Sequence, residues 1–427
     1  MSPWKGILRR AFGSRRWLGI FLVLHLLPFA ARPALIGGDE PHYALMAHSM
    51  AVDFDLTLED DYAEVKEGSK AAGRKRAGTV LDPHLTTVGG EVVFSHPLGL
   101  PALVAPLLAL QQSLAPGAAP DLLLPGLTLL LTFLALMAGW QLLEAATGER
   151  RKATFALICL VFATPLWFYG RTFFTEPYVA ALGVLALWCR WRQRPFLASF
   201  LLAIAFLLKE TAVLLILPWL LYELDRHGRG AAARLALGPA LAYVLFCGKN
   251  LLVYGAAFRT FQRFEIGDPL AGVFGLLFGS TAGLLFFAPP ALILAAAFFS
   301  RPSPKQDRWQ TPETYALIVV LGYFLVTAAW IDWKGGSGYG PRLLVPALPA
   351  LGFPLARLLR QGRWTKTVGV AAVLGFAVQW NAVTDPVEAF WSVEIQDLVA
   401  GRPGMFVLGL VLGVLLVRTS LRRRPEA

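Results

Sequence analysis

Long apolar segments alternate with short charged stretches along almost the whole chain. The first segment runs from about residue 17 to 36, and an apolar helix of that length crosses a hydrocarbon core of roughly 30 Å. Twelve further segments follow it, at 97–111, 121–143, 153–168, 175–189, 195–208, 211–223, 232–252, 281–299, 313–331, 343–359, 367–382 and 404–417. The pattern predicts an all-α polytopic membrane protein with about 12–13 transmembrane helices.

The basic clusters predict the orientation of these helices. If all thirteen segments crossed, the clusters between residues 150 and 308 would lie opposite the basic N-terminus, which the positive-inside rule disfavours. If segment 97–111, with its three prolines, is re-entrant or lies on the surface, every cluster joins the N-terminus in the cytoplasm. We therefore expect twelve spans, organised as a cytoplasmic basic N-terminus (1–16), a transmembrane core (17–360) and C-terminal helices with a basic cytoplasmic tail (361–427).

Composition supports a membrane protein and disfavours several other classes. The 427 residues are 56% hydrophobic and 16% charged, with a mean hydropathy of +0.56, which is too apolar for a soluble protein. The net charge of +11 is explained by cytoplasmic loops and needs no nucleic-acid partner. Cys159, Cys189 and Cys247 fall inside apolar segments without metal-ligand spacing, so we expect packing residues, with neither disulfides nor a zinc site.

The predicted topology gathers an unusual set of charges outside the cytoplasm. Residues 37–96 form a long first loop on that side, and Lys209 with Glu210 interrupts an apolar stretch from 196 to 221. Lys334 and Arg342 bracket a glycine-rich turn. Each basic residue could simply reach lipid headgroups, but several on one face favour a functional site.

Two adjacent carboxylates, Asp39 and Glu40, stand where the first apolar segment ends. Asp39 can cap a short helix through about Met50, with Pro41 in its first turn. One face of this helix would carry Tyr43, Met46, Ala47 and Met50, which predicts an amphipathic helix lying on the membrane surface. Two interpretations of Asp39 therefore stay open: a purely structural helix cap and a catalytic residue.

Five motifs on the predicted outer side occur in a recognisable order. They are Asp39-Glu-Pro-His42-Tyr43, His96-Pro-Leu-Gly, Thr175-Glu176-Pro177, Lys209 at a helix end, and the turn from Trp333 to Arg342. Together they resemble the GT-C superfamily of polyprenyl-phosphate-dependent glycosyltransferases, nearest to family 39, the protein O-mannosyltransferase and aminoarabinose-transferase type. The resemblance covers roughly residues 17–360. Two departures are Leu98, where the family often has a proline, and the lack of a soluble domain after the last span.

The resemblance implies transfer of a sugar from a polyprenyl monophosphate, with inversion, to an acceptor outside the cytoplasm. The phosphate leaves as an anion, so one carboxylate suffices, as the general base on the acceptor hydroxyl. Asp39 matches the motif acid and is the expected base, with Glu40 as the alternate. Lys209, Arg342 and Lys334 are expected to bind the phosphate, because fixed positive charge stabilises the leaving group.

Further residues are expected to position the substrates. Glu176 would orient the sugar or acceptor, or else pair with Arg171, and His96 would contact phosphate or sugar or simply bond within the loop. The remaining candidates are His42, Tyr43 and Tyr339 for the substrate, and Arg259 and Arg263 for the lipid. The glycines near 335–340 form no nucleotide P-loop, because no Gly-Lys-Ser/Thr follows them.

The expected partners are the lipid-linked donor, an extracytoplasmic lipid, glycan or protein acceptor, and membrane lipids. No cofactor is required, although the carboxylates are compatible with a divalent metal. We expect a multi-pass protein of the bacterial inner membrane with its site facing the periplasm or the exterior. The competing class is a transporter or flippase of a lipid-linked or anionic substrate, but we find no paired half-repeats, and the charges gather at one surface.

Overall fold

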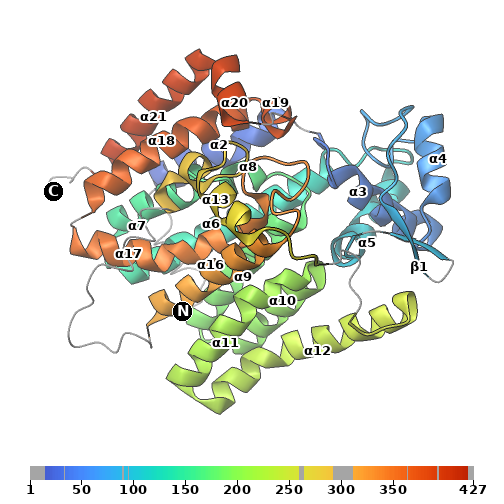
Figure 1. Ribbon diagram of the computed structural model, residues 1–427, viewed down its shortest axis with the longest axis horizontal. Helices are drawn as coiled ribbons and strands as arrows, with labels where there is room; N and C mark the ends of the chain where they lie inside the picture. The colour runs from blue at the N-terminus through green and yellow to red at the C-terminus, as the bar shows by residue number, and fades with distance from the viewer. Residues whose placement is uncertain are drawn as a thin grey trace.

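The computed structural model describes residues 15–32, 34–88, 91–94, 96–258, 264–291, 311–362, 364–391 and 394–421. These form a bundle of helices with one short hairpin at its side (Figure 1). The elements are α2 (Arg15–Ala31), α3 (Glu40–His48), η1 (Ser49–Asp53), α4 (Glu59–Glu67), β1 (Leu85–Val88), β2 (Glu91–Phe94), α5 (Gly99–Leu114), α6 (Leu123–Thr147), α7 (Arg150–Leu157), η2 (Ile158–Phe162), α8 (Leu166–Tyr169), α9 (Thr175–Trp191), α10 (Pro195–Leu208), η3 (Glu210–Ala212), α11 (Val213–His227), α12 (Arg229–Tyr254), α13 (Pro269–Phe278), α14 (Leu284–Phe287), α16 (Pro312–Ala329), η5 (Arg342–Leu351), α17 (Gly352–Gln361), α18 (Thr365–Thr384), α19 (Pro386–Trp391), α20 (Ile395–Gly401) and α21 (Pro403–Leu421).

Six helices in the described part of the chain are long and apolar enough to cross a membrane. They are α6, α12, α16, η5 continued by α17, α18 and α21. Shorter apolar helices, α2, α5, α10 and α13, accompany them. The predicted all-α membrane architecture is confirmed at this level, while the count of twelve spans and their orientation stay predictions.

Several predicted segments are interrupted rather than continuous. Segment 153–168 divides into α7, the π-helical turn η2 and the short helix α8, and Pro165 directly precedes α8. Segment 343–359 begins as the 3₁₀ helix η5, which contains Pro346 and Pro349. Proline lacks the N–H that an interior α-helical turn needs, which accounts for irregular backbone at both places. The expected break at Lys209 is present, because this residue is extended between α10 and η3.

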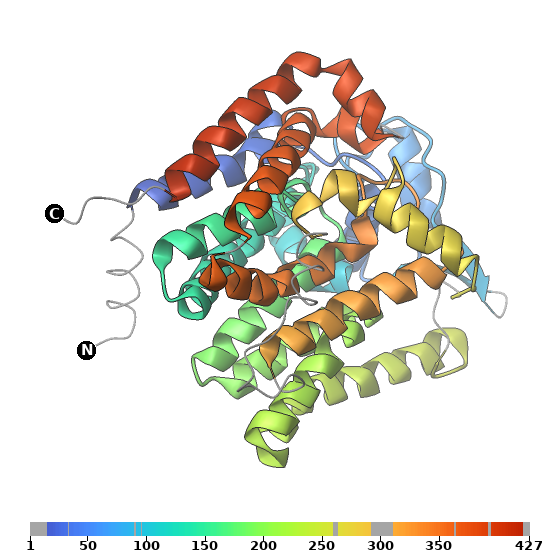
Figure 2. The ribbon, with the colours of Figure 1, turned by 60° about the vertical axis from the view of Figure 1, so that its left-hand side comes forward.

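We call residues 37–96 the first-loop region, and its described residues form a structured lobe beside α5 (Figures 1 and 2). Its hairpin was not predicted from the sequence: β1 and β2 pair antiparallel, with Leu85 opposite Phe94. The prediction that α3 lies amphipathically on the membrane surface is wrong. Every residue from Glu40 to Ala47 is buried, because α3 packs against α5 on one side and the rest of this lobe encloses it.

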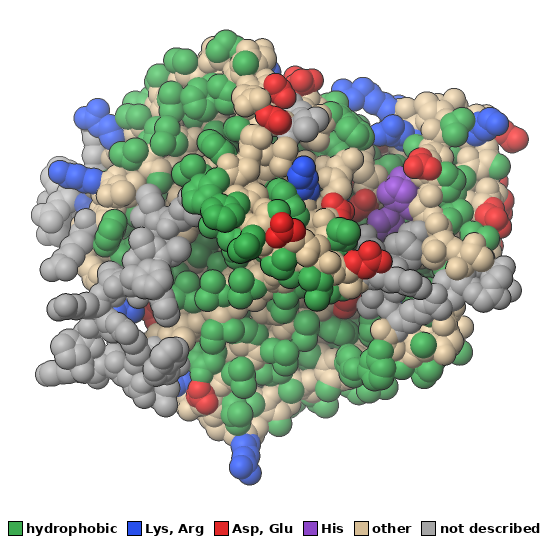
Figure 3. Space-filling view, in the orientation of Figure 1, with side chains coloured by type: hydrophobic (Ala, Val, Ile, Leu, Met, Phe, Trp, Pro, Cys, Tyr) green, Lys and Arg blue, Asp and Glu red, His purple; other side chains and the backbone are tan. Residues whose placement is uncertain are grey.

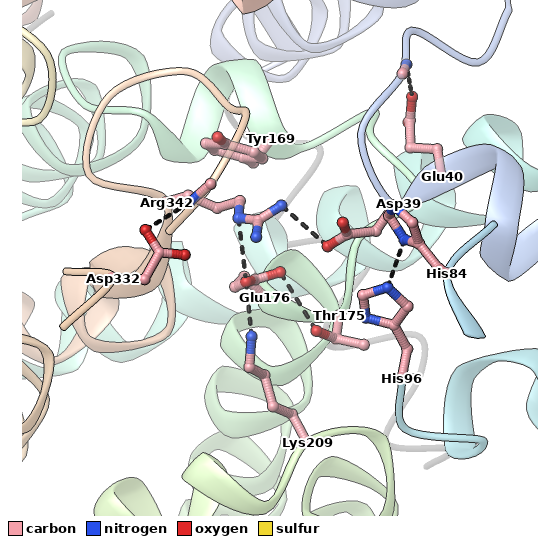
Figure 4. Close-up of polar contacts among 12 residues, drawn as sticks. Asp39, Glu40, His84, His96, Tyr169, Thr175, Glu176, Lys209, Asp332 and Arg342 are labelled. Carbon is pink, nitrogen blue, oxygen red and sulfur yellow. Dashed lines mark hydrogen bonds and ion pairs between the residues drawn. The ribbon is translucent and has the colours of Figure 1, made fainter. Parts of the chain in front are cut away.

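Helix packing brings four chain segments together at one end of the bundle. Helix α9 packs between α6 and α10 and also contacts η5, while α10 packs along α12. The start of α9, the end of α10, the start of η5 and the start of α3 therefore meet (Figure 4). The start of α5 lies against the end of α10 at Gly99, where an added Cβ would be 2.0 Å from the carbonyl oxygen of Leu207.

Candidate active site

A cavity of about 930 Å³ opens where these four segments meet. Charged side chains line one part of it, including Asp39, Glu176, Lys209 and Arg342. Apolar side chains line another part, from α5, α10, α12 and α16: Leu103, Ile204, Leu207, Leu245, Phe246 and Val326. A charged recess beside an apolar wall suits a ligand that has an ionic head and a hydrocarbon tail.

Four of the lining residues form a continuous ion-pair network, shown in Figure 4. Arg342 Nη1 lies 3.0 Å from Asp39 Oδ2, and Arg342 Nε lies 3.6 Å from Glu176 Oε1. Lys209 Nζ lies 2.8 Å from the same Glu176 oxygen. The two cations thus share one carboxylate oxygen, and Arg342 bridges the two acids.

Asp39 occupies the N-cap position of α3, and Pro41 lies in the first turn as predicted. Its side chain makes no capping hydrogen bond, so the structural interpretation as a side-chain cap is wrong. The carboxylate instead turns toward Arg342. Burial by itself would raise the pKa of Asp39, but the positive charges of Arg342 and Lys209 outweigh it and lower the pKa to about 2. Asp39 is therefore ionised at neutral pH.

Glu40, the alternate base, does not line the cavity. Its side chain is fully buried and accepts hydrogen bonds from the backbone N–H groups of Ile36, Gly37 and Phe173. The carboxylate ties the end of the first apolar segment to the start of α9, with Arg171 contributing positive charge nearby. The expectation that Glu40 could replace Asp39 is contradicted by this placement, since a base must reach the reacting proton.

The alternative that Glu176 pairs with Arg171 is wrong, while its expected role in orienting a substrate stays a prediction. It lies in the first turn of α9, where the helix dipole favours a carboxylate. It pairs with Lys209 and Arg342 rather than with Arg171, whose guanidinium instead donates to the backbone carbonyl of Ala34. Its second oxygen, Oε2, accepts a hydrogen bond from the hydroxyl of Thr175, at 3.3 Å.

Two histidines from the first-loop region line the cavity beside Asp39. The Nδ1 of His84 and the Nε2 of His96 are 2.7 Å apart, and both residues line the cavity with Asp39. Burial lowers the pKa of His84 and lowers that of His96 to about 4, so both imidazoles are neutral at pH 7. Ligand atoms of Asp39, His84 and His96 all lie within 4.8 Å of one another, close enough to hold a metal ion together.

Other predicted site residues are divided between cavity and scaffold. Tyr43 lines the cavity, but His42 lies behind it and stacks on His84. Tyr339 is buried against Phe168 and Phe287, and its backbone is bound by the hydroxyl of Tyr169. Lys334 is exposed, lies over Trp333 and does not line the cavity, so it is not placed to bind a phosphate there. Arg259 and Arg263 lie outside the described residues.

Lys249 and His84 also line the cavity but were not predicted as site residues. Lys249, on α12, lies over the rings of Phe246 and Tyr254, which all face the cavity. His84 carries no motif, but four of the six histidines fall within the first-loop region. That clustering was the available signal, because histidine is scarce elsewhere in the chain.

Comparisons with known proteins give no indication of what this site does. The chain matches no protein-family model, no curated protein and no solved structure.

Proposed function

We propose that this protein is an inverting glycosyltransferase that moves a sugar from a polyprenyl monophosphate to an acceptor outside the cytoplasm. The observation that carries the proposal is the ion-pair network of Asp39, Arg342, Glu176 and Lys209 at the wall of a large, partly apolar cavity. A carboxylate, two fixed cations and an apolar wall are the groups that such a reaction requires.

The proposed chemistry assigns the two cations to the donor phosphate. The acceptor oxygen attacks the anomeric carbon from the face opposite the phosphate, the bond from carbon to phosphate oxygen breaks, and the phosphate leaves as an anion. Lys209 and Arg342 stabilise the charge that develops on it. The proton of the acceptor hydroxyl passes to Asp39.

Arg342 couples donor binding to the base. Its guanidinium holds Asp39 in the structure, and this contact keeps the carboxylate weakly basic. An incoming phosphate competes with Asp39 for the guanidinium, so donor binding makes Asp39 a stronger base. The base would thus be activated only when a donor is in place.

The apolar wall supports a lipid-linked donor over a water-soluble one. The apolar wall leads from the charged recess to α12, which carries exposed hydrophobic side chains such as Leu241, Leu245 and Leu252, on a surface where hydrophobic side chains are widespread (Figure 3). A polyprenyl tail could follow this wall into the hydrocarbon core. We extend the proposal to a bacterial inner membrane with the site on its periplasmic side, as the distribution of basic residues favours.

A transporter or flippase is the second candidate, because the helices are broken beside the cavity. The extended residue Lys209, the turn η3 and the 3₁₀ helix η5 are features that transporters use at substrate sites. The two candidates differ in the fate of the donor: a transferase consumes it, whereas a transporter moves it unchanged across the bilayer.

The test measures consumption and movement of labelled polyprenyl-phosphate sugars by the full chain in liposomes. Transfer or hydrolysis by wild type, lost in Asp39→Asn but kept in Asp385→Asn, supports the transferase. Asp385 is a matched control because it is an exposed aspartate paired with Arg402, away from the cavity. Movement of unchanged donor without consumption would instead support the transporter and overturn the proposal.

A further inference from the structure

Two histidines and Asp39 bring ring nitrogens and a carboxylate oxygen close together at the cavity wall. His84 Nδ1 and His96 Nε2 point at each other across 2.7 Å, and a carboxylate oxygen of Asp39 completes a group whose atoms all lie within 4.8 Å (Figure 4). A first-row metal ion, with ligand bonds of about 2.1 Å, holds neighbouring ligand atoms about 3 Å apart. Small side-chain movements therefore suffice to centre an ion between the three.

Supporting contacts hold one of these imidazoles in place from behind. The hydroxyl of Tyr62 accepts a hydrogen bond from the backbone N–H of His84, at 3.1 Å, and lies 2.7 Å from Nδ1 of His42. The His42 ring in turn stacks on the His84 ring, with centroids 3.6 Å apart and planes at 16°. Outer contacts that fix the orientation of ligand rings are typical of metal sites.

The charge of the cavity leaves room for a cation. Among the described lining residues, four carboxylates stand against three basic side chains when the histidines are neutral: Asp39, Glu176, Glu210 and Asp332 against Lys209, Lys249 and Arg342. A divalent ion beside Asp39 would turn this excess of one negative charge into an excess of positive charge, which favours an anionic ligand.

We propose that Asp39, His84 and His96 form a binding site for a divalent transition-metal ion of the zinc type, with open coordination positions facing the cavity. Two imidazoles and one carboxylate favour such an ion over Mg²⁺ and Ca²⁺, which prefer oxygen ligands. Asp39 keeps Oδ2 for Arg342 and offers Oδ1 to the ion.

The site deepens the proposed function without depending on it. Its role in transfer rests on that function: the ion adds positive charge near the donor phosphate and lowers the pKa of an acceptor hydroxyl that it holds. Binding of the ion itself requires only the three side chains.

The first test is a Co²⁺ titration of chelator-treated, full-length protein in detergent, followed by visible absorption. Wild type should bind one equivalent at the site, and His84→Ala and His96→Ala should each weaken the binding by about 100-fold or more. His48→Ala is the matched control, because His48, Asp53 and Asp61 form the other group of possible ligands in the described chain. Unchanged affinity in both cavity variants, or a loss confined to His48→Ala, overturns the proposal.

The second test needs no variant and so does not depend on mutant folding. X-ray absorption of Zn²⁺-loaded wild type should show two imidazole ligands with bond lengths of about 2.0–2.1 Å. Fewer than two imidazoles would contradict the site. Sugar transfer is assayed on the same samples. Zinc bound through two imidazoles without any transfer contradicts only the proposed function. Transfer by protein whose zinc shows fewer than two imidazole ligands contradicts only the metal site.

Discussion

Two buried glutamates, Glu176 and Glu223, are each paired with a cation from another helix, yet they stand in different surroundings. Glu176 begins α9 and faces the cavity of about 930 Å³. Glu223, on α11, pairs with Arg190 near the end of α9, beside a smaller cavity of about 290 Å³. One helix thus carries an ion pair at each end.

The two pairs differ in how completely the carboxylate is used. Arg190 binds Glu223 through both oxygens, with Nε and Nη2 each at 2.9 Å, and His227 adds a contact at 3.2 Å. This planar, two-pronged geometry fixes two helices and leaves little for a ligand. At Glu176, by contrast, two cations crowd onto Oε1 alone.

The difference separates a pair that holds the fold from one that is available for chemistry. Burial is similar, since the Glu176 and Glu223 side chains are 2% and 5% exposed. What distinguishes them is that the cations at Glu176 lie at the wall of a large cavity and can turn to an incoming anion. Substitutions at the two ends of α9 should therefore have opposite signatures.

The largest effect is expected at Asp39, the acid joined to Glu176 through Arg342. Asp39→Asn removes the proposed base while keeping its shape, so kcat/KM for sugar transfer should fall by about 10³-fold. Initial rates with labelled donor measure this, and Glu223→Gln should stay within about twofold of wild type as the control. If kcat/KM of Asp39→Asn fell by less than tenfold, Asp39 would not be the base.

The next largest effect is expected at Lys209, where Lys209→Met should lower kcat by about 10²-fold. The substitution deletes one cation from the developing phosphate charge, and single donors of this kind are worth about 10²–10³ in rate. Glu176 keeps Arg342 as a partner, so the thermal unfolding midpoint should change little. Lys209→Arg should recover part of the rate; equal rates for Lys209→Met and wild type would contradict a phosphate-binding role.

Much of the fold was predictable because the apolar runs set the helices. Segment 195–208 coincides with α10, Pro195–Leu208, and segment 121–143 lies within two residues of the start of α6. The first-loop region was not predictable in the same way. The burial of α3 depends on packing against α5, which comes much later in the chain, and the hairpin depends on cross-strand pairs such as Leu85 with Phe94; neither depends on a run of one residue type.

The site was partly predictable for a related reason. Topology placed Asp39, Glu176, Lys209 and Arg342 on one face, and the structure brings them into one network. Which neighbour points inward could not be predicted: Asp39 and Glu40 are adjacent, yet only Asp39 faces the cavity. Likewise, the chain turns between Lys334 and Arg342 at Gly335 and Gly336, with φ of +77° and +66°. Arg342 lines the cavity after this turn, whereas Lys334 does not.

The opposite signature is expected at the other end of α9. Glu223→Gln should leave transfer intact but lower the free energy of unfolding by about 2 kcal/mol. The substitution leaves the mostly buried Arg190 without its carboxylate partner, and partial screening of this pair by solvent keeps the loss moderate. Thermal unfolding in detergent measures the loss. Replacing both residues, as Arg190→Met with Glu223→Leu, should restore most of the stability, since the uncompensated charge is then gone. A double variant no better than Glu223→Gln alone would contradict this account, because the charged pair would then stabilise the fold more than two apolar side chains in its place.

The smallest effect is expected for a pair at the surface. Arg360 and Glu313 meet at 3.4 Å, but the arginine side chain is 50% exposed, so solvent screens the attraction. Glu313→Gln should change the free energy of unfolding by less than about 0.5 kcal/mol and leave transfer unchanged. The same unfolding assay provides the baseline for Glu223→Gln. If both variants lost equal stability, burial would not explain why the pair at Glu223 holds the fold, and loss of any carboxylate near a helix end would be the simpler account.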